Sequence, residues 1–198
     1  MLRIGITGGI GSGKSVVCRY FSALQIPYYN ADEEAKYIID HDPGIRKKLK
    51  AYFGEASYSK NGLNKSFVRK KVFGNSVALA KLNEITHPVI LNHFDNWCNE
   101  KRKAKHPFII KEAALVFESD SYKSLDFIIT VIAPIATRIT RVMKRDGKSK
   151  DEVEVIIKKQ MSDEEKIKRS NYVINNPDDE LLLPEIVKLH EIILQKII

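Results

Sequence analysis

Eight residues close to the amino terminus follow the pattern G-x-x-x-x-G-K-[ST]: Gly8-Gly9-Ile10-Gly11-Ser12-Gly13-Lys14-Ser15. The apolar run Leu2–Thr7 precedes them, and a helical pattern, Lys14–Leu24, begins at the lysine. Glycines have no Cβ, so several backbone N–H groups can turn toward one point, where a helix N-terminus adds partial positive charge. A strand, this loop and a helix in that order predict a phosphate-binding loop (P-loop) rather than a glycine-rich turn without a ligand.

The loop residues have separate predicted tasks. Lys14 is expected to neutralise charge on the β- and γ-phosphate oxygens of ATP, as a catalytic residue, and the Ser15 hydroxyl to ligate Mg²⁺. The residues predicted to bind ATP in this stretch are Gly9, Gly11, Ser12, Gly13, Lys14, Ser15 and Val16. A guanine-specific protein would carry N-K-x-D, but Asn64-Lys65-Ser66-Phe67 lacks the aspartate, and motor ATPases are usually much longer chains. The short chain, with an insertion after the second strand and a basic helical segment near its end, favours a kinase among the P-loop proteins.

Further short apolar runs alternate with helical stretches along the chain, which is the pattern of a parallel sheet covered by helices on both faces. The expected additional strands are Gln25–Tyr29, Phe108–Ala113, Asp126–Ala133 and Tyr172–Ile174. The expected additional helices are Ala31–Asp40, Ser76–Lys103 with a kink or break at Pro88, Ile135–Arg145, two that begin at the capping boxes Ser149/Glu152 and Ser162/Glu165, and Asp178–Lys196. The predicted fold is α/β, a three-layer P-loop fold around a five-stranded parallel sheet.

The connection between the second and third strands is too long for a simple crossover. It contains the turn signal Asn61-Gly62 among helical patterns, which predicts an inserted helical lobe for the phosphate acceptor. The predicted organisation is one domain, 1–198, with a core of 1–30, 105–135 and 170–198, an insertion at about 31–104 and a helical lid at about 136–169.

Composition limits the partners and the compartment. The 198 residues carry 33 Lys+Arg and 25 Asp+Glu, a formal charge of +8, which favours anionic ligands or simply solvates helix faces. The 2 cysteines, Cys18 and Cys98, form no metal or redox motif. No signal segment precedes the first strand, and the longest apolar run, Phe127–Ala133, is too short to span a bilayer. We therefore expect a cytoplasmic protein that uses ATP, with no nucleic acid, membrane or obligate protein partner.

Carboxylates at strand ends are candidates for the chemistry, because ligands of open α/β sheets bind outside the carboxyl ends of the strands. Asp32 follows the second strand and either accepts a proton from the attacking hydroxyl or caps the next helix; both remain open. Glu112 ends the third strand and is predicted to help hold Mg²⁺. Asp126 precedes its strand and is a weaker candidate, and Glu118 is expected to be structural.

Arginines follow the fourth strand at helical spacing. Arg141 and Arg145 are four residues apart and share a helix face, which suits phosphate oxygens, although a solvated basic face remains open.

Several blocks together resemble the dephospho-CoA kinase family over nearly the whole chain. The blocks are Gly8–Ser15, Asn30-Ala31-Asp32, Leu82-Asn83-Glu84-Ile85-Thr86-His87-Pro88, Leu115-Val116-Phe117-Glu118, Arg141-Val142-Met143-Lys144-Arg145-Asp146-Gly147, Gln160 and Tyr172-Val173-Ile174-Asn175-Asn176. The resemblance implies the last step of coenzyme A synthesis, in which ATP phosphorylates the ribose 3′-hydroxyl of 3′-dephospho-CoA, and a sheet order of 2-3-1-4-5. Another small nucleoside or nucleotide kinase is the alternative.

The same resemblance implies roles for individual residues. Asp32 is then the catalytic base and an acceptor contact, Arg141 a catalytic lid residue on the phosphates, and Arg145 and Asn176 ATP contacts, with Asn176 near the adenine. Lys36, Lys65 and His87 are implied acceptor contacts, and His87 is alternatively a capping or core histidine. The chain departs from the family pattern at Val16 (often Thr), Asn30 (often Asp), Lys65 (often Arg) and Arg138 (often Gln), which leaves a bidentate contact from position 65 in doubt.

Overall fold

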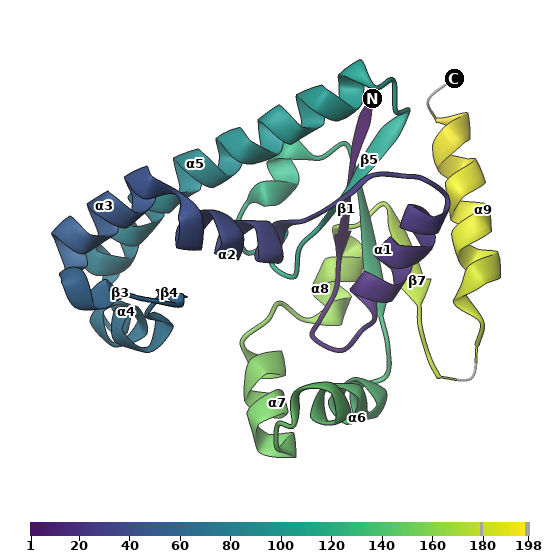
Figure 1. The fold of residues 1–198 in the computed structure, drawn as a ribbon. Helices are drawn as coiled ribbons and strands as arrows, with labels where there is room; N and C mark the ends of the chain where they lie inside the picture. Colours follow the sequence, from purple (N-terminus) through teal and green to yellow (C-terminus); the bar gives the residue numbers. More distant parts are fainter. Residues whose placement is uncertain (179, 197–198) are drawn as a thin grey trace. The chain divides into compact units, whose positions relative to one another are not determined.

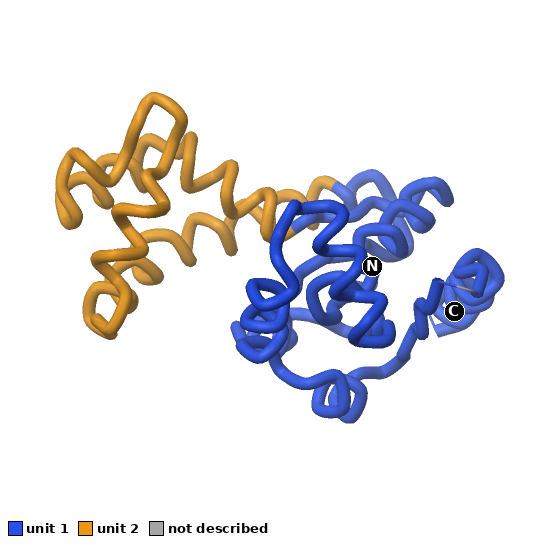
Figure 2. The backbone as a smooth tube through the Cα atoms, turned by 90° about the horizontal axis from the view of Figure 1, so that it is seen from below, with its two compact units in different colours: residues 1–30, 101–198 blue, residues 31–100 orange. Residues whose placement is uncertain are grey.

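The computed structural model describes residues 1–178 and 180–196 of the chain. Its described part forms two compact units: residues 1–30 with 101–198, and residues 31–100. Figure 1 labels the helices and strands, and Figure 2 colours the two units separately.

The first unit is built on a five-stranded sheet. Its strands are β1 (Leu2–Thr7), β2 (Tyr28–Asn30), β5 (Phe108–Glu112), β6 (Phe127–Ile132) and β7 (Tyr172–Asn175). They are ordered β2-β5-β1-β6-β7, and every neighbouring pair is parallel. The predicted parallel sheet and its 2-3-1-4-5 order are confirmed.

Successive side chains of each strand point to opposite faces of the sheet, and each face packs against helices. Ile4 and Ile6 of β1 and Ile129 of β6 pack with α1 (Lys14–Ala23) and α9 (Leu182–Gln195) in one core cluster, and all three are fully buried. The intervening residues, such as Ile128 and Thr130, face the other side of the sheet, where α8 (Asp163–Lys168) contacts β6 and Thr130 bonds Ser170. Both faces are covered, as expected for strands that are apolar on both sides.

Two element boundaries differ from the sequence prediction. The second strand is Tyr28–Asn30 rather than Gln25–Tyr29, because Gln25 has φ 61° and the Ile26 N–H still bonds the Phe21 carbonyl at the end of α1. The final helix begins at Leu182 rather than Asp178. Pro184 therefore falls in its first turn, where a proline is tolerated.

Three helices follow β6 in the predicted lid segment. They are α6 (Ile135–Asp146), which ends at Gly147, α7 (Lys150–Lys158), and α8. Ser149 and Glu152 form the complete capping box at the start of α7, and Ser162 accepts the Glu165 N–H at the start of α8. Ile139 and Val142 of α6 pack against Val153 of α7 in a small cluster of their own.

The second unit is mainly helical and has its own core. Its elements are α2 (Ala31–His41), α3 (Pro43–Phe53), the 3₁₀ turn Glu55–Ser57, a hairpin of β3 (Tyr58–Ser59) and β4 (Gly62–Leu63), α4 (Lys65–Val72) and α5 (Ser76–Lys103). Lys60 and Asn61 form the hairpin turn, Gly62 opens β4 opposite Ser59, and α5 is one continuous helix with Pro88 inside it. Ile45, Leu49 and Ile85 are among the residues that bury one another. Burial raises the pKa of Tyr58 to about 12, and its hydroxyl donates to the Ile39 carbonyl.

Among the described residues, no helix has the length and apolar content that crossing a membrane requires.

Candidate active site

The P-loop joins β1 to α1 and presents unpaired backbone donors. Gly11 and Gly13 have φ +78° and +98°, values that residues with a Cβ rarely adopt. Within the described part of the chain, the N–H groups of Gly11, Gly13 and Ser15 have no hydrogen-bond partner. Orphan N–H groups at a helix N-terminus form an anion site. The geometry thus suits the phosphates that the sequence predicts there.

Lys14 and Ser15 open α1 at the inner end of this loop. The Lys14 Nζ donates to the carbonyls of Gly8 and Gly9 at 3.0 and 3.2 Å. The Ser15 Oγ donates to Glu112 Oε1 at 2.6 Å. Glu112 lies in register with Asn30 of β2 and Ile6 of β1, so its carboxylate is held at the carboxyl edge of the sheet.

The Ser15–Glu112 pair fits a divalent cation. Glu112 is 5% exposed, and its Oε2 has no hydrogen-bond partner among the described residues. A buried carboxylate oxygen without a donor is expensive unless a cation or water meets it. Beside it, burial and then the Glu112 charge raise the pKa of the Cys18 thiol, which keeps that thiol protonated and inert.

Ile10 is held on both sides by residues from the lid segment. Its N–H donates to Gln160 Oε1 at 2.8 Å, and its carbonyl accepts from Arg138 Nε at 2.9 Å. Arg138 is only 3% exposed and also binds Asp163 Oδ2 through Nη1 at 2.8 Å. The guanidinium lies so close to Gly9 that a Cβ there would overlap it.

Arg141 and Asn176 meet at the other side of the loop. The Arg141 Nη2 donates to the Asn176 carbonyl at 3.1 Å and to Asp178 Oδ1 at 2.7 Å, and Nη1 reaches the Gly11 carbonyl at 3.4 Å. The buried Asn176 amide donates to the Ser12 carbonyl at 2.8 Å. The structure thus brings both residues to the P-loop, while the adenine contact of Asn176 stays a prediction.

Two of the predicted ATP-binding residues, Arg145 and Val16, form hydrogen bonds to residues close to them in the sequence. Arg145 is exposed and makes a bidentate pair with its neighbour Asp146, at 2.6 and 2.8 Å, which raises the pKa of Arg145. The Val16 N–H donates to the Gly13 carbonyl at 2.9 Å as part of the first turn of α1. Their ATP contacts therefore stay predictions.

The predicted acceptor residues belong to the second unit. Asp32 is exposed and is the second residue of α2, two residues beyond Asn30 at the N-cap position, which removes the capping alternative. Lys36 is exposed one turn later on the same face of α2. His87 is exposed in the interior of α5, so it is neither a core histidine nor a helix cap.

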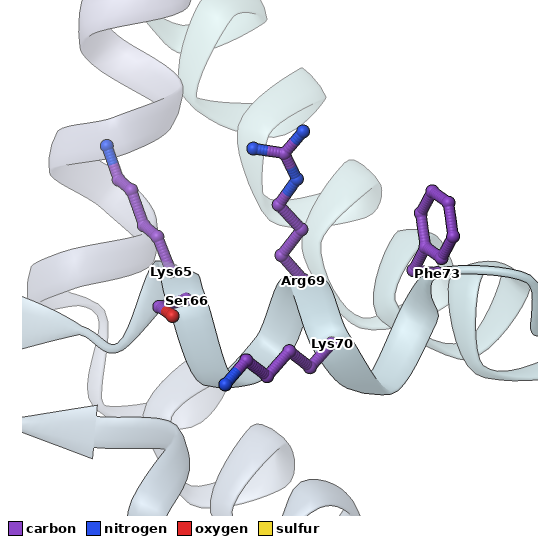
Figure 3. A pocket seen from close by; sticks show the side chains of 5 residues that line it. All are labelled: Lys65, Ser66, Arg69, Lys70 and Phe73. Carbon is purple, nitrogen blue, oxygen red and sulfur yellow. The ribbon is translucent and has the colours of Figure 1, made fainter.

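Lys65 opens α4 at the edge of a cavity of about 550 Å³. Its lining residues are Lys65, Ser66, Arg69, Lys70 and Phe73. Figure 3 shows Lys65 and Arg69, one turn apart, extending to the same side of the helix, with Phe73 one further turn along. Phe73 is 83% exposed, and within the described residues Lys65 and Arg69 have no acidic partner.

Two further carboxylates, Glu118 and Asp126, make contacts within the first unit. Burial would raise the pKa of Glu118, but the Met161 N–H at 3.0 Å and the buried Lys166 at 3.4 Å hold it below its usual value. Asp126 accepts the Arg3 N–H at 2.7 Å and so ties β6 to β1.

Comparison with known protein families covers the P-loop and the other residues described above. The profile of the family described as Dephospho-CoA kinase matches residues 2–181. The chain belongs to the dephospho-CoA kinase family. Membership implies ATP-dependent phosphorylation of dephospho-CoA, a transfer to an alcohol group within coenzyme A biosynthesis.

Relatives support this dephospho-CoA kinase assignment over the full length. The chain is 39% identical over 196 residues to "Dephospho-CoA kinase" from Bacteroides fragilis strain YCH46, covering 99% of this chain and 95% of the relative. It is 33% identical to that of Porphyromonas gingivalis over 197 residues, covering 99% and 96%. Among solved structures, "TT1252 from Thermus thermophilus" has a TM-score of 0.83 at 29% identity, covering 98% and 97%. "Dephospho-CoA kinase from Campylobacter jejuni" has a TM-score of 0.72 at 25% identity, covering 99% and 98%.

Sequence reasoning about this dephospho-CoA kinase family member missed the groups that hold the loop from outside. Arg138, Asp163 and Asp178 were given no role, and Gln160 only extended the resemblance. Gln160 lies 150 residues from the N–H that it accepts, and nothing in local sequence encodes such a contact.

Proposed function

We propose that this chain transfers the γ-phosphoryl group of ATP to the ribose 3′-hydroxyl of 3′-dephospho-CoA, with Asp32 as the catalytic base. The acceptor oxygen attacks the γ-phosphorus, the bond to the β-phosphate oxygen breaks, and ADP leaves. The hydroxyl proton passes to an Asp32 carboxylate oxygen. The observation that carries the proposal is the loop itself: within the described residues the N–H groups of Gly11, Gly13 and Ser15 have no partner, and Ser15 bonds the buried Glu112.

The charge that develops on the transferring group is met by fixed positive groups. Lys14 already points at the loop carbonyls of Gly8 and Gly9, within reach of phosphate oxygens placed in the loop. Arg141 is held beside Gly11 by Asp178 and Asn176. A guanidinium whose position is fixed in advance loses less entropy when it binds phosphate.

We propose Mg²⁺ as the metal ion. Phosphoryl transfer from ATP generally uses a divalent cation, which would neutralise phosphate charge and so lower the repulsion of the attacking hydroxyl. The Ser15 hydroxyl and the unpaired Glu112 Oε2 are the oxygen ligands that suit this ion. Glu112 is held by its strand register and Ser15 by its place at the start of α1, so neither ligand has to move far.

The acceptor is proposed to bind the second unit through Asp32, Lys36, Lys65 and His87. All four side chains are exposed, and Lys36 lies one turn from Asp32 on α2. The diphosphate of the acceptor suits the paired cations Lys65 and Arg69, and the exposed Phe73 ring suits its apolar arm. Arg69 thereby supplies the planar fork that Lys65 lacks.

An acceptor panel tests the reaction. Purified protein is given Mg·ATP with 3′-dephospho-CoA, AMP, CMP, dTMP or shikimate, and ADP formation is recorded. We expect 3′-dephospho-CoA to be preferred by orders of magnitude in kcat/KM, with the product phosphorylated at the 3′ position by NMR. Preference for a nucleoside monophosphate would replace this function with that of another small nucleotide kinase.

Asp32→Asn tests the base. The substitution keeps size and polarity, so Mg·ATP affinity is expected to stay within about twofold while kcat falls by about 10²–10⁴. Asp42→Asn is the matched control, because Asp42 caps α3 through the Ile45 N–H and has no proposed chemical role. Unchanged turnover in Asp32→Asn would remove Asp32 from the mechanism.

We further propose that the protein works in the cytoplasm without nucleic acid, membrane or obligate protein partner. Cys18 and Cys98 are both buried free thiols, as expected in a reducing compartment. Full activity of the purified chain alone, with no gel retention of oligonucleotides at low salt, is the expected result.

A further inference from the structure

Ile10 is the point where the P-loop is gripped from outside. Its N–H and its carbonyl belong to successive peptide groups, and both are bonded to residues of the lid segment, Gln160 and Arg138. Its side chain packs against the small cluster formed by Ile139, Val142 and Val153. Both polar backbone atoms and the apolar side chain of one loop residue are thus fixed by residues about 130 to 150 positions away.

The grip is rigid on the arginine side. Arg138 is 3% exposed, its Nη1 binds Asp163 at 2.8 Å and its Nε binds the Ile10 carbonyl at 2.9 Å. Charge-assisted bonds to a buried planar guanidinium fix its position closely. Since a Cβ on Gly9 would overlap this guanidinium, the arginine also packs directly on the loop backbone.

We propose that Arg138 and Gln160 are positioning residues for ATP, which form a clamp that holds the P-loop in its phosphate-binding shape before the nucleotide arrives. Each side chain acts on ATP indirectly, through its hydrogen bond to the backbone of Ile10. A glycine-rich segment has more backbone freedom than any other, and ordering it on binding weakens affinity. A clamp that orders the segment in advance strengthens ATP binding without a new contact to ATP.

The clamp also selects which donors face the phosphates. Because the Ile10 N–H donates to Gln160, it is already bonded, whereas within the described residues the N–H groups of Gly11, Gly13 and Ser15 have no partner. Releasing it frees the loop to reorient these donors. The inference rests on the proposed use of ATP, but it makes no use of the acceptor.

The test measures affinity and stability separately in the full chain. Titration calorimetry with Mg²⁺ and a non-hydrolysable ATP analogue is compared with titration by 3′-dephospho-CoA alone, and Tm is recorded for each variant. Arg138→Gln shortens the side chain and removes its charge, and Gln160→Leu keeps the volume and removes the acceptor oxygen. We expect each to raise the Kd of the ATP analogue about tenfold and to change the Kd of 3′-dephospho-CoA by less than about twofold.

Two further variants complete the design. Arg138→Lys keeps the charge but reaches one partner at a time, so its Kd is expected to lie between those of the native chain and Arg138→Gln. Arg19→Gln makes the same change at an exposed arginine of α1 and is expected to bind the analogue as the native chain does.

The clamp is overturned if Tm falls in both variants while the Kd of the ATP analogue stays within about twofold of the native value, because the two residues are then purely structural. If Arg138→Gln does not fold, the Kd of the ATP analogue for Gln160→Leu alone decides whether the clamp exists. If the native chain binds the ATP analogue and the variants lose it, while the acceptor panel shows no phosphorylation of 3′-dephospho-CoA, the clamp stands and only the proposed reaction falls.

Discussion

Glu112 is a charge placed where water scarcely reaches it. At 5% exposure its Oε1 accepts from Ser15 at 2.6 Å, and its Oε2 meets no donor by distance and angle within the described structure. A group of this kind destabilises the fold unless a cation binds to it. Such a local loss of stability indicates a functional role, because a purely structural position tolerates an uncharged residue better.

Glu112→Gln separates the metal role from folding. The amide still accepts from Ser15 but no longer attracts a cation, so the Mg²⁺ concentration for half-maximal activity is expected to rise about 10- to 100-fold. Removing a buried charge should leave Tm unchanged or higher. Magnesium titrations of activity and calorimetric melts without metal check both; an unchanged magnesium requirement contradicts the role.

Gly13→Ala tests the loop backbone. A Cβ at Gly13 meets the Asn176 amide in addition to the strain of φ +98°, whereas at Gly147 it meets open space with φ +66°. Gly147→Ala is therefore expected to cost about 1 kcal/mol of stability, from strain alone, with ATP binding intact. Gly13→Ala should abolish detectable binding of the ATP analogue by calorimetry, and near-native affinity would contradict this account of the loop.

The residues of the loop were predictable from sequence, but the residues around it were not. The residue types in Gly8–Ser15 predict the loop conformation directly. Glycine readily adopts the positive φ values found there, and a lysine and a hydroxyl suit phosphate and metal binding. Arg138 was predictable only as one arginine of a helix face; its burial depends on the P-loop backbone at Ile10 and on Asp163, which it contacts. Local sequence does not distinguish an arginine that becomes buried from one that stays exposed.

At the scale of elements, the linker between α7 and α8 is anchored to the core at one carboxylate. Glu118 accepts the Met161 N–H and lies 3.4 Å from Lys166, which is fully buried. Lys166 Nζ has no hydrogen bond in the described structure, so Glu118 is what balances its charge. This carboxylate therefore fixes the start of α8 and, with it, the end of the segment that carries Gln160.

The lowered pKa of Glu118 means that this carboxylate stabilises the fold at neutral pH and loses that effect in acid. A carboxyl whose pKa is lower in the folded state stabilises the fold above its unfolded pKa, and this contribution is lost as the pH falls below about 4.3 toward the folded pKa. Glu118→Gln should lose stability at pH 7 and show a flatter loss of Tm between about pH 5 and pH 3. Melts across this range check the slope; parallel curves for the two proteins would contradict the anchor.

Lid movement belongs to part of the segment rather than to all of it. The predicted lid, 136–169, divides in the structure, because Glu118 holds Met161 and the buried Lys166 at α8 while α7 packs through Val153 onto α6. We expect added ATP analogue and acceptor to slow amide exchange in α7 more than in α8. Hydrogen exchange with mass spectrometry measures this, and equal changes in both helices, or none, would contradict it.

Element types were predictable more closely than their ends. The strands were found because they are apolar on both faces, and α7 because its capping box is written in the sequence. The start of β2 was misplaced because Gln25-Ile26 continues the apolar run of a strand, while the chain is still leaving α1 there. Such a boundary is set by tertiary hydrogen bonds that a local pattern does not contain.

At the scale of the whole molecule, each unit has a core of its own. Ile4, Phe21 and Ile186 belong to the first core, and Leu49 and Phe53 to the second. All recorded contacts of the P-loop described above lie within the first unit. ATP binding and acceptor binding are thus expected to be separable properties.

Replacing residues 31–100 by a short Gly/Ser linker tests this separation. The product should remain folded by circular dichroism and bind the Mg·ATP analogue within about tenfold of the native Kd, because its P-loop contacts are retained. Phosphoryl transfer to 3′-dephospho-CoA should fall below detection. Loss of nucleotide binding in a chain that still melts cooperatively would contradict the division.

The proline that follows Asn176, whose amide bonds the Ser12 carbonyl, has a chemical consequence over the lifetime of the protein. Asparagine loses its amide when the next backbone nitrogen attacks it and closes a succinimide ring, and Pro177 has no N–H with which to do so. Asn61, which precedes Gly62 in the hairpin turn, has no such protection. An ageing preparation should accordingly acquire acidic charge variants at the hairpin long before the neutral amide beside the phosphate site is converted to an anion.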